Sequence, residues 1–130
     1  MSILNEEKIP AKKPETPKEL ADCVLALLDE HKAFDVKLLQ VNEKTVIADY
    51  FVLCSGSSNT QVKSLAGDIE YKLGLVGVNP LHEDGRHDDN WRVLDYGSVM
   101  VHVFHRSARE FYNLEKLWDM ASDIGEQSDE

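Results

Sequence analysis

The chain has 130 residues, with 24 acidic against 14 basic ones and a formal net charge of −10. This length fits one domain, and the acidic excess disfavours direct binding of nucleic acid, because phosphate contacts need clustered Lys and Arg. We expect no membrane span, since no apolar run approaches the ~20 residues that one requires, and no secretory signal. Cys23 and Cys54 are too few for a disulfide framework, which fits a reducing cytoplasm and small buried side chains.

The first element expected is a helix, preceded by a polar tail over residues 1–15 that contains two prolines. We expect this tail to be flexible. Thr16 can cap the helix, Pro17 suits its first turn, and Glu19 completes a capping box. The helix then carries one apolar stripe, which consists of Leu20, Val24, Leu27 and Leu28.

Two strands and a second helix follow. One strand is expected over residues 36–41, and the continuous apolar run at 50–54 is typical of a strand covered on both faces. Ser58 and Gln61 form a second capping box. The helix behind it is predicted to end near Gly74 and to turn toward the core the stripe Val62, Leu65, Ala66, Ile69 and Leu73.

The second half is predicted to contain three strands and a last helix. A strand over residues 78–82 precedes a polar, acidic loop over 83–90. Strands over 91–96 and 99–105 then form a hairpin around the turn Gly97-Ser98. Ser107 is expected to cap the last helix, with Glu110 completing its capping box and an apolar face formed by Phe111, Leu114, Leu117 and Trp118.

The predicted order α-β-β-α-β-β-β-α favours an α/β fold with a single domain. In such a fold, helices pack on one mixed sheet, here of about five strands. We expect this domain to cover residues 16–124 and an acidic tail to cover 125–130.

One pattern resembles an enzyme site. Gly56-Ser57 followed by Asp68 and Glu70 mimics the signature of metal-dependent nucleotidyltransferases, in which two alternating carboxylates on a strand hold magnesium. Here the carboxylates fall within the predicted helical stripe, where residues i and i+2 diverge by about 200° given ~3.6 residues per turn. They would not share an ion, so we expect solvated helix surface, no catalytic residue and no cofactor.

The histidines of the segment 82–89 and His102 are further candidates for a chemical role. Histidines and carboxylates gather between residues 82 and 89, but their spacing matches no standard zinc pattern, so we expect a solvated acidic loop and no metal. His102 alternates with Val101 and Val103, and we expect a core or sheet-face histidine with a hydrogen-bond partner. Neither set predicts an enzyme.

The strand over residues 91–96 carries the main candidates for binding a partner, namely Trp91, Leu94, Asp95 and Tyr96. Alternation along a strand puts Trp91, Val93 and Asp95 on one face, and Arg92, Leu94 and Tyr96 on the other. A buried aromatic anchor can contribute ~2 kcal/mol or more to an interface, although the same rings could simply pack onto the sheet.

Other features leave the kind of contact open. Asp95 could reach a basic partner or satisfy the backbone of the nearby turn. Tyr112, at the start of the last helix, is the more exposed candidate beside Phe111 and could extend a binding surface. Exposed aromatic side chains on a strand could also support a homodimer.

Three segments carry a family resemblance: Ala48–Gly56, Trp91–Phe104 and Arg109–Trp118. Together they resemble the ribosomal silencing factor family, also called the Iojap-like family, over about residues 17–121. The resemblance implies an α/β fold related to nucleotidyltransferases but without their activity. It also implies binding to large-subunit ribosomal protein fourteen, where such a factor blocks the joining of the two subunits and lowers translation when nutrients are scarce.

The chain departs from the family pattern at three places. Asp84-Gly85 stands where the family usually has Glu-Gly, and Gly97-Ser98 stands where the turn is usually Gly-Asp. Arg92 replaces a commonly apolar residue, and only this change bears on the chemistry of its strand face. The resemblance therefore predicts a cytoplasmic protein that acts by occlusion. A metal-dependent nucleotidyltransferase and a homodimeric ribosome-assembly adaptor are the alternatives.

Overall fold

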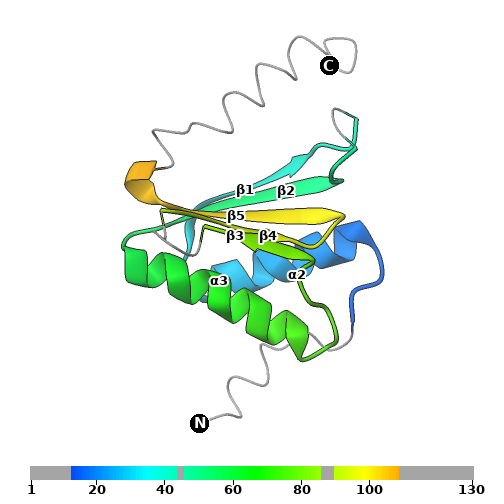
Figure 1. Ribbon diagram of the computed structural model, residues 1–130, viewed down its shortest axis with the longest axis horizontal. Helices are drawn as coiled ribbons and strands as arrows, with labels where there is room; N and C mark the ends of the chain where they lie inside the picture. The colour runs from blue at the N-terminus through cyan, green and yellow to red at the C-terminus, as the bar shows by residue number, and fades with distance from the viewer. Residues whose placement is uncertain (1–12, 44–45, 86–89, 109–130) are drawn as a thin grey trace.

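The computed structural model describes residues 13–43, 46–85 and 90–108. The elements run in the order α2 (Pro17–Glu30), β1 (Phe34–Gln40), β2 (Tyr50–Gly56), α3 (Asn59–Gly74), β3 (His82–Asp84), β4 (Trp91–Asp95) and β5 (Val99–His105) (Figure 1). This order confirms the predicted succession over the described part of the chain. Residues 1–12 of the predicted N-terminal tail, the predicted acidic tail over 125–130, most of the predicted last helix and Tyr112 lie outside the described residues.

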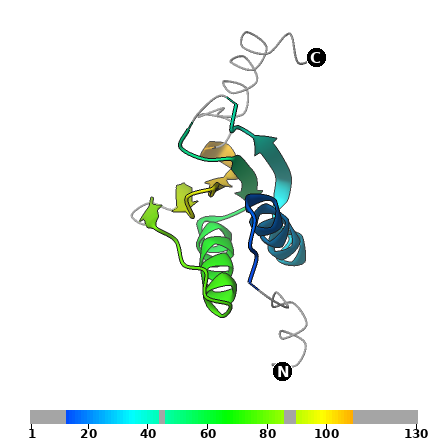
Figure 2. The ribbon, with the colours of Figure 1, turned by 90° about the vertical axis from the view of Figure 1, so that its right-hand side faces the viewer.

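The strands form one mixed sheet of five strands within the described residues, in the order β1-β2-β5-β4-β3. Only the central pair β2 and β5 is parallel, and the other three pairs are antiparallel. A parallel pair needs a long crossover, and α3 lies within this one. Helices α2 and α3 both pack on the same face of the sheet, which Figure 2 shows nearly edge-on. The predicted α/β fold with a single domain is therefore confirmed.

Polar side chains start both helices. Thr16 Oγ1 accepts a hydrogen bond from the backbone N–H of Glu19 at 3.1 Å, and Ser58 does the same for Gln61 at 3.1 Å. In a standard capping box, the side chain of the third helical residue accepts a hydrogen bond from the backbone N–H of the capping residue. At α2 this bond is shifted by one residue, because Glu19 Oε1 accepts from the N–H of Glu15 and not from that of Thr16. The caps satisfy backbone donors that the first helical turn leaves without a partner.

The main core lies between the two helices and the sheet. The predicted stripe of α3 is buried as expected, with Val62, Leu65, Ala66, Ile69 and Leu73 each at most 2% exposed. It packs on side chains of the central strands, namely Val52, Cys54, Leu94, Val101 and Val103. A second buried cluster lies on the other face of the sheet and consists of Val41, Ala48, Phe51, Leu53 and Phe104. Burial on both faces explains the continuous apolar run of β2.

Two side-chain contacts join α2 and its C-terminal cap to α3. Lys72 Nζ lies 3.2 Å from Glu30 Oε2, and the Lys72 residue is only 7% exposed. His31 Nδ1 lies 3.2 Å from Asp68 Oδ2. The sequence reading missed both pairs, because the partners are far apart in the chain and neither spacing suggests them.

Two local predictions are wrong. The strand expected over residues 78–82 is β3, which begins only at His82; Pro80 has no N–H to give to a ladder, and pairing starts where His82 meets Asp95. Ser107 does not cap the last helix, since the chain is already helical at residue 106. The ring of His105 takes the capping role instead, and its Nδ1 accepts from the N–H of Ser107 at 3.2 Å.

Candidate functional site

The strand β4 divides its side chains between the two faces of the sheet. Arg92 and Leu94 are buried, at 6% and 0% exposure, on the side that faces the helices. Trp91, Val93 and Asp95 are partly exposed on the opposite side. The period of two that the sequence predicts is therefore confirmed, and it decides which of the candidate residues a partner could touch.

Leu94 and Tyr96 do not lie on the surface that carries Trp91. Both belong to the core under the helices, and Tyr96 is 8% exposed. Burial, with smaller contributions from the carboxylates of Glu70 and Glu83, raises the pKa of the Tyr96 hydroxyl, so this group stays neutral. Of the four candidates on this strand, we correct Leu94 and Tyr96 to core residues and retain Trp91 and Asp95.

Trp91 is held by two aromatic neighbours on β5. Its ring stacks on Phe104, with 5.1 Å between the ring centroids and 25° between the ring planes. Its Nε1–H donates a hydrogen bond to His102 Nδ1 at 3.1 Å. His102 is 5% exposed, and burial lowers its pKa to about 4. The sheet-face histidine with a hydrogen-bond partner is thus confirmed.

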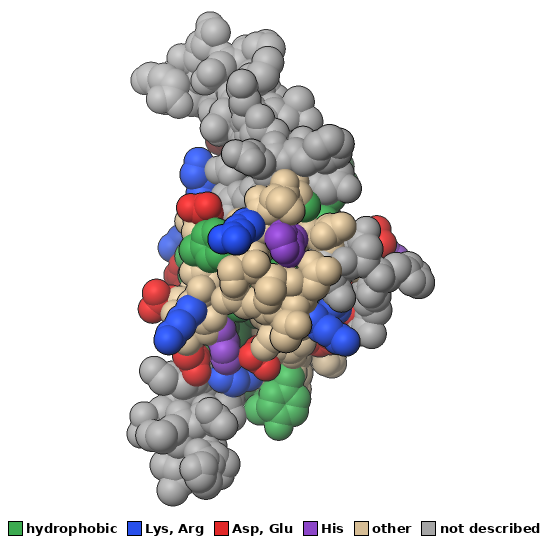
Figure 3. Space-filling view, turned by 90° about the vertical axis from the view of Figure 1, so that its left-hand side faces the viewer, with side chains coloured by type: hydrophobic (Ala, Val, Ile, Leu, Met, Phe, Trp, Pro, Cys, Tyr) green, Lys and Arg blue, Asp and Glu red, His purple; other side chains and the backbone are tan. Residues whose placement is uncertain are grey.

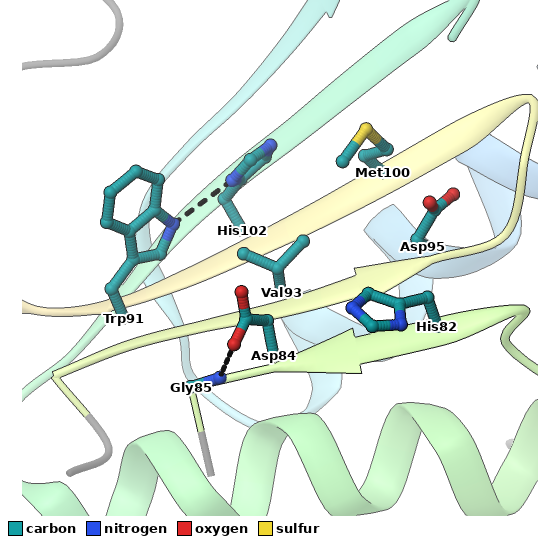
Figure 4. A pocket seen from close by; sticks show the side chains of 8 residues that line it. All are labelled: His82, Asp84, Gly85, Trp91, Val93, Asp95, Met100 and His102. Carbon is teal, nitrogen blue, oxygen red and sulfur yellow. Dashed lines mark hydrogen bonds between the residues drawn. The ribbon is translucent and has the colours of Figure 1, made fainter. Parts of the chain in front are cut away.

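A hollow of about 410 Å³ opens beside Trp91 on this face (Figure 4). Strands β3, β4 and β5 supply its lining, which consists of His82, Asp84, Gly85, Trp91, Val93, Asp95, Met100 and His102. The strand register explains the set, because His82 pairs with Asp95 and Val93 pairs with His102. Side chains far apart in the sequence therefore meet on one surface.

The two carboxylates of the hollow are fixed by local backbone. Asp95 Oδ1 accepts from the N–H of Gly97 at 2.8 Å, which is the turn contact that the sequence offered as one of two roles for this residue. Asp84 Oδ1 accepts from the N–H of Gly85 at 2.8 Å. Each bond uses one carboxylate oxygen and holds the carboxylate in place beside the apolar side chains that line the hollow, Val93 and Met100. Such a surface suits an apolar or cationic group of a partner.

The carboxylates that mimic a nucleotidyltransferase lie elsewhere, on α3. Asp68 pairs with His31, and Glu70 follows it two positions later on the same helix. Residues at that spacing are about 200° apart around a ~3.6-residue turn, so their side chains point in directions about 160° apart. Within the described residues, no group of three His, Cys, Asp or Glu side chains is placed to hold a metal ion. The described geometry gives no support to the enzyme alternative.

The remaining surface is mixed in charge where it can be seen. In Figure 3, acidic and basic side chains are interspersed and apolar ones are few on the visible face outside the grey atoms. None of the described helices is long and apolar enough to cross a bilayer. The hollow beside Trp91 combines partly exposed aromatic, apolar and acidic side chains.

The sequence reading missed several members of this site. His102 could have been found, because a two-residue turn at Gly97-Ser98 already pairs Val93 with His102 in the hairpin. His82 and Asp84 could not, since the start of β3 was misplaced. Tyr112 lies outside the described residues, and its part in a binding surface stays a prediction.

The fold and the site define a small α/β protein with a hollow on one sheet face that aromatic, apolar and acidic side chains line, which makes this face the candidate binding surface. Residues 14–130 match the family model described as ribosomal silencing factor during starvation. The chain belongs to this family, which confirms the resemblance seen in the sequence.

Relatives agree with this placement. The chain is 36% identical over 101 residues to the ribosomal silencing factor of Bacillus subtilis, covering 78% of this chain and 86% of that protein. It is 28% identical over 95 residues to the chloroplastic Iojap protein of Zea mays, covering 73% of this chain and 41% of that one. A crystal structure of a Chromobacterium violaceum protein is similar with a TM-score of 0.78 at 30% identity, covering 81% of this chain and 88% of that one.

Proposed function

We propose that the chain binds the large ribosomal subunit at large-subunit ribosomal protein fourteen and thereby prevents the small subunit from joining. Family membership supports a ribosomal partner, because the relatives are named as ribosomal silencing factors. The observation that carries the choice of surface is the hollow beside Trp91, where Trp91 and Asp95 face the same way. Repression of translation follows from occlusion, which requires no reaction.

The chemistry of the hollow fits a basic protein partner. The partly exposed indole of Trp91 can anchor an interface, and the carboxylates of Asp84 and Asp95 can attract a lysine or arginine side chain. Ribosomal proteins are generally basic, and the net charge of −10 would steer this chain toward them. We further propose that the chain acts in the cytoplasm.

The test is sedimentation of a mixture of small and large subunits with and without the purified protein. We expect the wild-type protein to shift joined ribosomes toward separate subunits, without any nucleotide. Trp91→Ala should lose most of this effect. Tyr71→Ala is the matched control, because Tyr71 is an aromatic residue on α3 that is 65% exposed and lies outside the hollow.

Unchanged sedimentation at saturating wild-type protein would refute the proposal. Release of pyrophosphate that depends on magnesium would instead favour a nucleotidyltransferase. A homodimer that forms through Trp91 is a further alternative, and sedimentation of the protein alone distinguishes it, since Trp91→Ala would then change the mass of the free protein.

A further inference from the structure

His102 stands where an apolar side chain would be expected. It lies on β5 between the rings of Phe51 and Trp91, with centroid distances of 4.9 Å and 6.0 Å. It is 5% exposed, and within the described part of the chain it accepts a hydrogen bond from the Trp91 indole, at 3.1 Å. Phenylalanine or leucine would fill such a site without burying a polar ring.

The hydrogen bond fixes the protonation of the ring. Indole nitrogen only donates, so His102 Nδ1 must accept and cannot carry a proton. The proton of the neutral ring therefore resides on Nε2. Nε2 is buried and has no hydrogen-bond partner among the described residues. A buried N–H without a partner lowers the stability of a fold.

We propose that His102 is a positioning residue that holds the Trp91 indole in the orientation needed to line the hollow. This inference rests on the proposed function of that surface. The unsatisfied Nε2–H destabilises the fold, and the fixed indole is what the protein gains in return. Because the indole N–H is bound to His102, the partner meets the ring face and edge of Trp91 and receives no hydrogen bond from it.

The experiment compares His102→Phe with His102→Asn in the full chain. Phenylalanine keeps an aromatic ring but offers no acceptor, whereas the asparagine Oδ1 can replace Nδ1 as acceptor. Three quantities are measured: the melting temperature, the indole N–H resonance of Trp91 with its rate of hydrogen exchange, and binding to purified large subunits. Comparison with Trp91→Phe assigns the resonance, because the chain has two tryptophans.

We expect His102→Phe to melt at the same temperature as wild type or higher. Its Trp91 indole proton should exchange faster, and binding should weaken by about fivefold, which is the loss of one neutral hydrogen bond. His102→Asn should restore both the slow exchange and most of the binding. A residue with a merely structural role would not combine gained stability with weakened binding.

Each other outcome is decisive. The proposal is overturned if His102→Phe unfolds or melts much lower, because His102 would then be a packing residue. It is also overturned if the indole resonance and its exchange rate stay unchanged, or if they change while binding does not. If the wild-type protein does not bind large subunits, the proposed function fails, and the indole measurement alone still decides whether His102 orients Trp91.

Discussion

Trp91 and Leu94 lie three positions apart on β4, and alanine substitutions at the two should separate binding from stability. Leu94 is fully buried under the helices, so Leu94→Ala should cost about 2–5 kcal/mol of folding free energy. For a domain of this size that loss lowers the melting temperature by roughly 10 °C or more. The folded fraction should still bind large subunits normally.

Trp91→Ala should weaken binding strongly and should also cost some stability. The stack on Phe104 and the bond to His102 both stabilise the fold, so their loss should cost about 1–3 kcal/mol. Binding to large subunits should fall by about thirtyfold or more, equivalent to ~2 kcal/mol.

Thermal unfolding and binding are measured for both variants at a temperature at which each is folded. The reasoning is refuted if folded Trp91→Ala binds as well as wild type. It is also refuted if Leu94→Ala keeps its stability but loses binding, because Leu94 would then belong to the interface.

Three further predictions concern stability. Glu30→Gln should destabilise the fold by about 2–4 kcal/mol in urea unfolding, because it leaves the Lys72 ammonium buried without its carboxylate. Lys72→Met removes the buried charge and should be near neutral. Equal losses of stability in the two variants would contradict this reasoning. Gly85→Ala should destabilise far more than Gly77→Ala in thermal unfolding. Both glycines have φ near +87°, but only at Gly85 would an added Cβ clash with the carbonyl oxygen of Trp91. Because burial lowers the pKa of His102 to about 4, against about 6.5 in the unfolded chain, protonation should lower the stability by up to about 3 kcal/mol as the pH falls from 6.5 toward 4. Denaturant titrations at pH 7 and pH 4.5 measure this loss, and His102→Phe should not show it. If His102→Phe loses as much stability between the two pH values as the wild type does, the loss does not come from His102.

Periodicity predicted most of the fold. The stripe of α3 and the alternation of β4 follow directly from which residues are apolar, and both are confirmed. What alternation could not give is the side of the sheet on which the helices pack. That side depends on how the β2–β5 crossover is closed, and it decides that Leu94 and Tyr96 are core residues while Trp91 and Asp95 line the hollow.

Contacts between distant segments were the other limit. The pair Lys72–Glu30 joins residues 42 positions apart, and the only sequence signal is that Lys72 lies on the buried side of α3, three residues after Ile69. The contribution of β3 to the hollow depends on its pairing with β4, which the chain between the two strands does not reveal. The sequence therefore predicted the residues of the site that β4 supplies, and not those that β3 supplies.

The central claim is tested most directly by photo-cross-linking from the floor of the hollow. A photoreactive amino acid replaces Val93, which is partly exposed between Trp91 and Asp95, and the protein is irradiated on purified large subunits. The same group in place of Tyr71 on α3 is the control. We predict that the product from position 93 is a cross-link to large-subunit ribosomal protein fourteen and that position 71 gives none. A dominant cross-link from position 93 to another ribosomal protein, to ribosomal RNA or to a second copy of this chain would contradict the account.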